Sequence, residues 1–71
     1  MPMKLYSIQV AGQVDVNELN PMSPQYMTAI KLGPTLTLFT ICTDQSGLLG
    51  LLRHLHKLGI MLLVVTCEEN S

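Results

Sequence analysis

The chain has 71 residues, of which 48% are hydrophobic and only 13% are charged, and its formal net charge is −1. Its four Lys and Arg residues are scattered and form no basic stripe, which argues against a nucleic-acid-binding surface. The sequence has neither a run of about 20 apolar residues nor the pattern of a signal peptide. We therefore expect one soluble cytoplasmic domain, residues 1–71, with no nucleic-acid or membrane partner.

The first segment, residues 4–14, alternates between apolar and polar side chains, which is typical of a strand with one solvated face. Residues 15–25 contain two prolines and two asparagines without a sustained period. They predict a loop, with one helical turn at Val16 to Leu19.

Two runs rich in β-branched and aromatic residues follow, residues 26–32 and 35–43, separated by Gly33-Pro34. A turn-forming pair between two such runs predicts a β-hairpin. Later, residues 60–66 read IMLLVVT, and this continuous apolar run predicts a strand buried on both faces. The polar residues 68–71 are expected to form a flexible tail.

A helix is predicted between the last two strands, because leucines recur there at spacings of three and four. They are Leu48, Leu51, Leu52, Leu55 and Leu58. Asp44 is placed to cap the helix by accepting hydrogen bonds from the amides of Ser46 and Gly47. Gly59 is placed to end it in a left-handed conformation.

Two resemblances extend this interpretation. Residues 5–66 resemble a family of small, functionally uncharacterised bacterial proteins, on the residues Thr43-Asp44-Gln45, Gly50-Leu51-Leu52, Leu58-Gly59 and Leu63-Val64-Val65. Residues 36–66 also resemble the first strand-helix-strand unit of ACT domains, regulatory modules that bind amino acids or other small effectors. Asp44, Gly47, Leu48 and Leu49 match the turn of that family, and Gly59 and Ile60 match its helix end.

The ACT resemblance covers less than half of the chain, and Ser46 stands where that family usually has proline. It implies a ferredoxin-like arrangement in which an antiparallel strand lies between the two strands that flank the helix. The order of the predicted elements, three strands, a helix and a last strand, itself predicts an α+β fold with a single four-stranded, mainly antiparallel sheet and one helix on one face. The ferredoxin-like analogy adds the order of the strands. The predicted strand order is 26–32, 35–43, 4–14, 60–66.

The predicted order has a consequence for the two cysteines, Cys42 and Cys67. Two strand spacings, roughly 9 to 10 Å, would separate them, which is beyond disulfide reach. If the strands 35–43 and 60–66 were direct neighbours instead, a disulfide would be feasible.

Metal-binding and catalytic constellations are not legible in the sequence. His54 and His56 are two residues apart, so on a helix they point about 200° away from each other, and metal ligands prefer spacings of three or four. Asp44 has no histidine or nucleophile near it in a triad pattern. We therefore predict no metal, no cofactor and no enzymatic activity.

The helix start is the candidate ligand site. Gly47 and Gly50 form a G-x-x-G pattern that brings backbone amides close to a bound molecule, and helix N-termini attract anions. Gly50 is alternatively explained by close contact between helix and sheet. The predicted ligand-binding residues are Asp44, Gln45, Ser46, Gly47 and Gly50.

The second face of the sheet is the candidate interface. One helix covers one face only, and leaving several large apolar side chains exposed on the other is costly. We place Phe39, Ile41, Met61, Leu63 and Val65 on a homodimer interface. The sequence thus favours a non-enzymatic interaction or regulatory module that acts as a homodimer. The alternative is an ACT-like sensor of an amino acid or anionic effector at the helix start.

Overall fold

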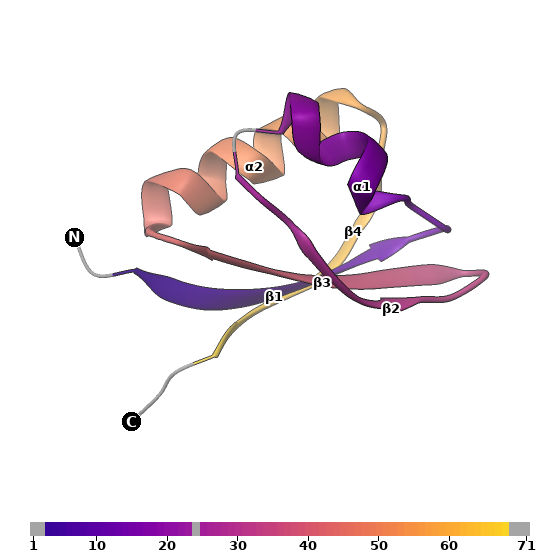
Figure 1. The fold of residues 1–71 in the computed structure, drawn as a ribbon, viewed down its shortest axis with the longest axis horizontal. Helices are drawn as coiled ribbons and strands as arrows, with labels where there is room; N and C mark the ends of the chain where they lie inside the picture. Colours follow the sequence, from indigo (N-terminus) through magenta and orange to yellow (C-terminus); the bar gives the residue numbers. More distant parts are fainter. Residues whose placement is uncertain (1–2, 24, 69–71) are drawn as a thin grey trace.

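The computed structural model describes residues 3–23 and 25–68. Within these residues, four strands and three helical segments follow one another (Figure 1). In order, they are β1 (Lys4–Ala11), α1 (Val16–Leu19), η1 (Asn20–Met22), β2 (Thr28–Leu32), β3 (Leu36–Thr43), α2 (Gln45–Lys57) and β4 (Leu62–Glu68). The fold is α+β with one antiparallel sheet in the order β2-β3-β1-β4, so the predicted fold class and strand order are confirmed.

Strand β1 lies at the centre of the sheet and pairs antiparallel with both β3 and β4. Its buried side chains, Tyr6, Ile8 and Val10, point to one face, because successive residues of a strand alternate between faces. Gly12, with φ of 87°, ends the strand earlier than the predicted boundary at residue 14. The following backbone amide of Val14 donates instead to the Thr37 hydroxyl, at 2.9 Å.

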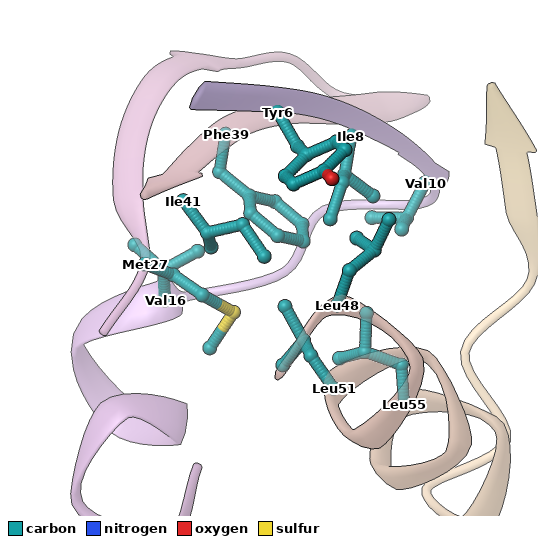
Figure 2. Close-up of a cluster of buried hydrophobic side chains, with 10 residues drawn as sticks. All are labelled: Tyr6, Ile8, Val10, Val16, Met27, Phe39, Ile41, Leu48, Leu51 and Leu55. Atoms are coloured by element: carbon teal, nitrogen blue, oxygen red, sulfur yellow. The ribbon is translucent and has the colours of Figure 1, made fainter. Parts of the chain in front are cut away.

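Helices α1 and α2 both lie on the same side of the sheet (Figure 1). The core lies between these helices and the sheet. Among the described residues it consists of ten buried side chains: Tyr6, Ile8, Val10, Val16, Met27, Phe39, Ile41, Leu48, Leu51 and Leu55. Figure 2 shows the aromatic and β-branched side chains of β1 and β3 facing the three leucines of α2, with Met27 and Val16 closing one side. The predicted apolar stripe of α2 is therefore its buried face, except that Leu58 is exposed.

The prediction that Phe39 and Ile41 face outward is wrong. Phe39 is 0% exposed and Ile41 is 1% exposed, and both lie under α2 (Figure 2). The register explains this placement, because Phe39 stands opposite Ile8 and Ile41 opposite Tyr6. Directly opposed residues share one face of an antiparallel pair, so the alternation of β1 fixes which side of β3 is covered.

The predicted ends of α2 are confirmed. Asp44 Oδ1 accepts a hydrogen bond from the backbone amide of Gly47 at 2.8 Å. Of the two predicted donors, Ser46 and Gly47, only Gly47 caps the helix in this way. At the other end, Gly59 adopts φ of 78°, a left-handed conformation that favours glycine. The amide of Ile60 still donates to the Leu55 carbonyl at 3.1 Å, so β4 starts at Leu62 rather than at residue 60.

Strand β4 is an edge strand and is not buried on both faces, contrary to the prediction from its apolar run. Six of its seven residues are exposed, and only Val65 is half-buried. An apolar run alone does not distinguish a central strand from an edge strand, because that distinction depends on the strand order. The predicted tail begins inside β4, since Glu68 is its last residue, and residues 69–71 lie outside the described residues.

The segment between β1 and β2 contains the predicted helical turn at Val16–Leu19, capped by Asp15 Oδ1, which accepts from the amide of Asn17 at 3.0 Å. It continues into η1. The side chain of Asn20 then bonds both backbone groups of Met27: Nδ2 donates to its carbonyl at 3.0 Å, and Oδ1 accepts from its amide at 2.8 Å. This clamp holds the segment close to the entry of β2 and helps to bury Met27.

Candidate functional site

The predicted ligand-binding turn at the start of α2 is occupied mainly by the chain's own groups. The amide of Gly47 is bonded to Asp44, and the amide of Leu48 donates to the Asp44 carbonyl at 3.0 Å. A methyl group added at Gly47 would overlap the Thr43 hydroxyl and lie 2.7 Å from Gln25 Nε2. Gly47 is therefore required by close packing against these side chains.

The five predicted ligand-binding residues do not form one site. Gln45 and Ser46 are exposed, while Asp44 and Gly47 are half-buried in the packed turn. Gly50 lies one helical turn further on and lines a different feature. A methyl group there would meet nothing within 4 Å, so close contact between helix and sheet does not explain Gly50.

Gly50 lines a shallow pocket of about 460 Å³ between α2 and the segment that contains η1. The α2 side of this pocket has three basic side chains, and the η1 side has a proline, a methionine and a serine. The lining residues are Pro21, Met22, Ser23, Gly50, Arg53, His54 and Lys57. We refer to this feature as the basic pocket, because no Asp or Glu is among its lining residues.

His54 carries a polar atom without a partner. Its Nε2 is buried and has no hydrogen bond to any of the residues 3–23 and 25–68. A neutral imidazole has one donor and one acceptor nitrogen, and a buried polar atom without a partner costs about 1 to 3 kcal/mol. This cost makes His54 a residue whose position is not explained by the fold alone.

The sequence analysis missed the basic pocket, although one signal for it was present. Gly50, Arg53, His54 and Lys57 follow the spacing i, i+3, i+4, i+7 and therefore share one helix face. The other wall comes from residues 21–23, which are brought over this face only by the tertiary fold.

The five residues predicted for an interface fall into two groups. Phe39 and Ile41 belong to the core, and Val65 is half-buried against it. Met61 and Leu63 are accessible, with exposures of 66% and 48%. Their neighbours Leu62 and Val64 are also exposed, at 42% and 46%. Leu62 stands opposite Val10 and Val64 opposite Gln9, so the accessible apolar side chains of residues 61–64 lie along the sheet edge on both of its faces.

An apolar groove of about 410 Å³ adjoins this strand at the C-terminal end of α2. Its lining is mostly aliphatic and includes two of the exposed residues just described. The lining residues are Leu52, Leu55, His56, Gly59, Ile60, Met61 and Leu62. The outer edge of β4 and this groove together form one apolar surface, which we call the β4 surface.

The open face of the sheet is less apolar than the sequence suggested. Its two central strands carry both polar and apolar side chains there, since Ser7 stands opposite Thr40 and Gln9 opposite Leu38. On the β4 side, Ser7 stands opposite Thr66, and its hydroxyl donates to Glu68 Oε1 at 2.9 Å. This mixed face does not require the complete cover that a fully apolar one would need.

The two cysteines are free and lie on different strands separated by β1. Cys42 stands opposite Leu5 and Cys67 opposite Tyr6. Because Leu5 and Tyr6 point to opposite faces of β1, the two thiols lie on opposite faces of the sheet. The predicted separation of the two cysteines is confirmed.

The described residues contain neither a group of metal-ligating side chains nor a helix able to span a membrane. Within residues 3–23 and 25–68, no three His, Cys, Asp or Glu side chains are grouped so that they could hold a metal ion. No helix in the same part of the chain has both the length and the apolar character needed to cross a membrane.

Comparisons of the chain with protein-family models, curated proteins and solved structures found no match.

Proposed function

We propose that this chain is a small interaction module that functions as a homodimer, in which two copies pair through the β4 surface. The observation that supports the proposal is the run of four exposed apolar residues, 61–64, at the start of an edge strand and beside an apolar groove. The role proposed is binding rather than catalysis.

The backbone of β4 supports a strand as the partner. The side of an edge strand that faces away from the sheet presents a row of N–H and C=O groups without strand partners. A second β4 strand would pair with this row and extend the sheet. Antiparallel pairing about a two-fold axis uses the same surface on both copies and gives a closed dimer.

The charge distribution of β4 is compatible with self-pairing. No Asp, Glu, Lys or Arg occurs from Met61 to Cys67, so apolar and small polar side chains would meet across the axis. Glu68 is the only carboxylate of the strand, and its hydrogen bond to Ser7 holds it over its own sheet. In an antiparallel pair the two Glu68 residues would lie at opposite ends, so no like charges would be directly opposed.

Sedimentation equilibrium tests this proposal directly. We expect the average mass to rise from that of one chain toward twice that value as the concentration increases through the micromolar range. A mass that stays at one chain up to millimolar concentration would show that the proposal is wrong. A mass that rises without limit would also contradict it, because a two-fold dimer is closed.

An effector site at the start of α2, as the ACT resemblance implies, is the second candidate. The exposed Gln45 and Ser46 support it, because their backbone amides are at a helix N-terminus, where anions are favoured. The packed surroundings of Gly47 weigh against it. Amide chemical shifts measured with a panel of amino acids would support this candidate if they changed at residues 43–51, and would contradict it if they did not change.

A further inference from the structure

We infer that the basic pocket binds a small molecule through a phosphate group. This site is separate from the β4 surface, since the two share no lining residue. It also differs from the predicted effector turn, because the α2 wall of the pocket runs from Gly50 to Lys57, whereas the turn starts at Asp44.

The charge of the pocket supports an anionic ligand. Arg53 and Lys57 are two of only four Lys and Arg residues in the chain, and both line this one pocket. Within residues 3–23 and 25–68, neither side chain has an ion-pair or hydrogen-bond partner. Two full positive charges match the charge of a phosphate monoester, roughly −1.5 to −2 at neutral pH, better than that of a single carboxylate.

The position of the pocket near the C-terminal end of α2 opposes anion binding, but this effect is smaller than the attraction by the two cations. The C-terminal end of a helix carries roughly half of a negative elementary charge, which accounts for the preference for cations there. That preference explains Lys57 at the last turn of α2, even if no ligand is bound. It does not explain why Arg53 and Lys57 share a pocket with Gly50.

Gly50 is the second observation. Glycine in a helix interior is unfavourable relative to alanine, because it loses more backbone freedom on folding. Neither packing nor a positive φ requires it here, since a methyl group would meet nothing within 4 Å and its φ is not positive. The missing side chain leaves room on the pocket wall next to Arg53 and His54.

His54 is the third observation. Its unpartnered Nε2 belongs to a residue of the pocket wall, on the same helix face as the two cations. When Nε2 carries the ring proton it is a hydrogen-bond donor, and a phosphate oxygen is an acceptor of matching chemistry. A phosphate would thus satisfy the residue that the described part of the chain leaves without a partner.

The test is a titration followed by amide chemical shifts, with inorganic phosphate, glycerol 1-phosphate and acetate added separately at constant ionic strength. We expect saturable changes at residues 21–23 and 50–57 with at least one of the two phosphates, and none with acetate. The ratio of their dissociation constants would show whether the site prefers a free or an esterified phosphate. The absence of saturable changes with both phosphates would overturn the inference.

Variants make the test specific. Arg53→Gln and Lys57→Gln should each weaken binding by about tenfold or more, the usual loss for one charge-assisted contact. Gly50→Leu should block the pocket while keeping both cations, and leucine is a good helix former, so the helix is retained. Lys31→Gln, on β2, is the matched control and should bind phosphate as the unchanged chain does. Equal effects of Lys31→Gln and Arg53→Gln would overturn the inference, because they would indicate charge screening without a site.

Discussion

The two edge strands of this sheet differ in how well they are protected against pairing with another chain. β2 has five residues, and the register shift at Ile30 interrupts it in the middle. Lys31 follows that irregularity directly. β4 has seven residues, and its own irregularity, at Leu63, lies near the start and leaves Val64 to Glu68 regular. The residue directly after the irregularity is Val64 in β4, whereas it is Lys31 in β2.

Short length, a bulge and a lysine are features that natural proteins use to prevent edge-to-edge association. β2 has all three, whereas β4 has only a bulge near one end, together with exposed apolar side chains at residues 62–64. Exposure of apolar side chains alone does not identify the interface, since Ile30 of β2 is also 59% exposed. What distinguishes β4 is an unprotected backbone edge combined with a run of exposed apolar residues.

The largest expected effect concerns folding and separates the core from the edges. Phe39→Ala removes a fully buried ring and should lower the free energy of unfolding by about 3 to 5 kcal/mol. Leu38→Ala, on the open face of the same strand, should cost roughly 1 kcal/mol, since this side chain is only half-buried. Urea denaturation, at protein concentrations below the dimer dissociation constant, measures both losses in the free energy of unfolding. Equal losses would mean that the covered face has been assigned incorrectly.

The next largest effect concerns association. Val64→Lys gives β4 a lysine like Lys31 of β2. This substitution should raise the dimer dissociation constant by about 100-fold or more, because a lysine in the paired edge must lose its hydration. Ile30→Lys adds the same charge to the other edge and serves as the control. Sedimentation equilibrium of both variants would contradict the assignment if Ile30→Lys dissociated the dimer and Val64→Lys did not.

A smaller effect, on the free energy of unfolding, is expected from a substitution at the start of α2, away from both edge strands. Gly47→Ala places a methyl group against the Thr43 hydroxyl and Gln25, and the required shifts should cost about 1 to 3 kcal/mol of unfolding free energy. Dimer affinity should be unchanged, because the altered residue is not part of the β4 surface. Thermal denaturation detects the loss, and an unchanged melting temperature would show that this turn is not tightly packed.

The smallest effect has the opposite sign. Gly50→Ala meets no neighbouring atom and should stabilise the chain by about 0.5 to 1 kcal/mol, since alanine loses less backbone freedom in a helix. The same denaturation experiment measures it beside Gly47→Ala. Destabilisation by Gly50→Ala would show that the space beside this residue is filled in solution.

Much of the fold follows from local rules in the sequence. Asp44 and Gly59 specify both ends of α2, and the turn at Val16–Leu19 is preceded by a residue that caps it. The strand order came from the ferredoxin-like analogy. These features depend on a few neighbouring residues or on one topological rule, so no tertiary detail was needed to predict them.

The orientation of β3 could not be predicted from β3 alone. Its sequence LTLFTICT has two apolar positions or more on each face, so either face could have been the covered one. Only its register with β1, whose buried side chains Tyr6, Ile8 and Val10 share one face, determines that Phe39 is buried. The basic pocket was missed for a related reason, because η1 reaches α2 through the fold and through the Asn20 clamp on Met27.

Amide hydrogen exchange at several protein concentrations is the most direct test of pairing through β4. We predict that the β4 amides that point away from β1 exchange rapidly at low concentration and become protected as the concentration rises. The outward amides of β2 should remain unprotected throughout. Protection of β2 instead, or β4 exchange that is independent of concentration, would contradict the assignment of β4 as the interface.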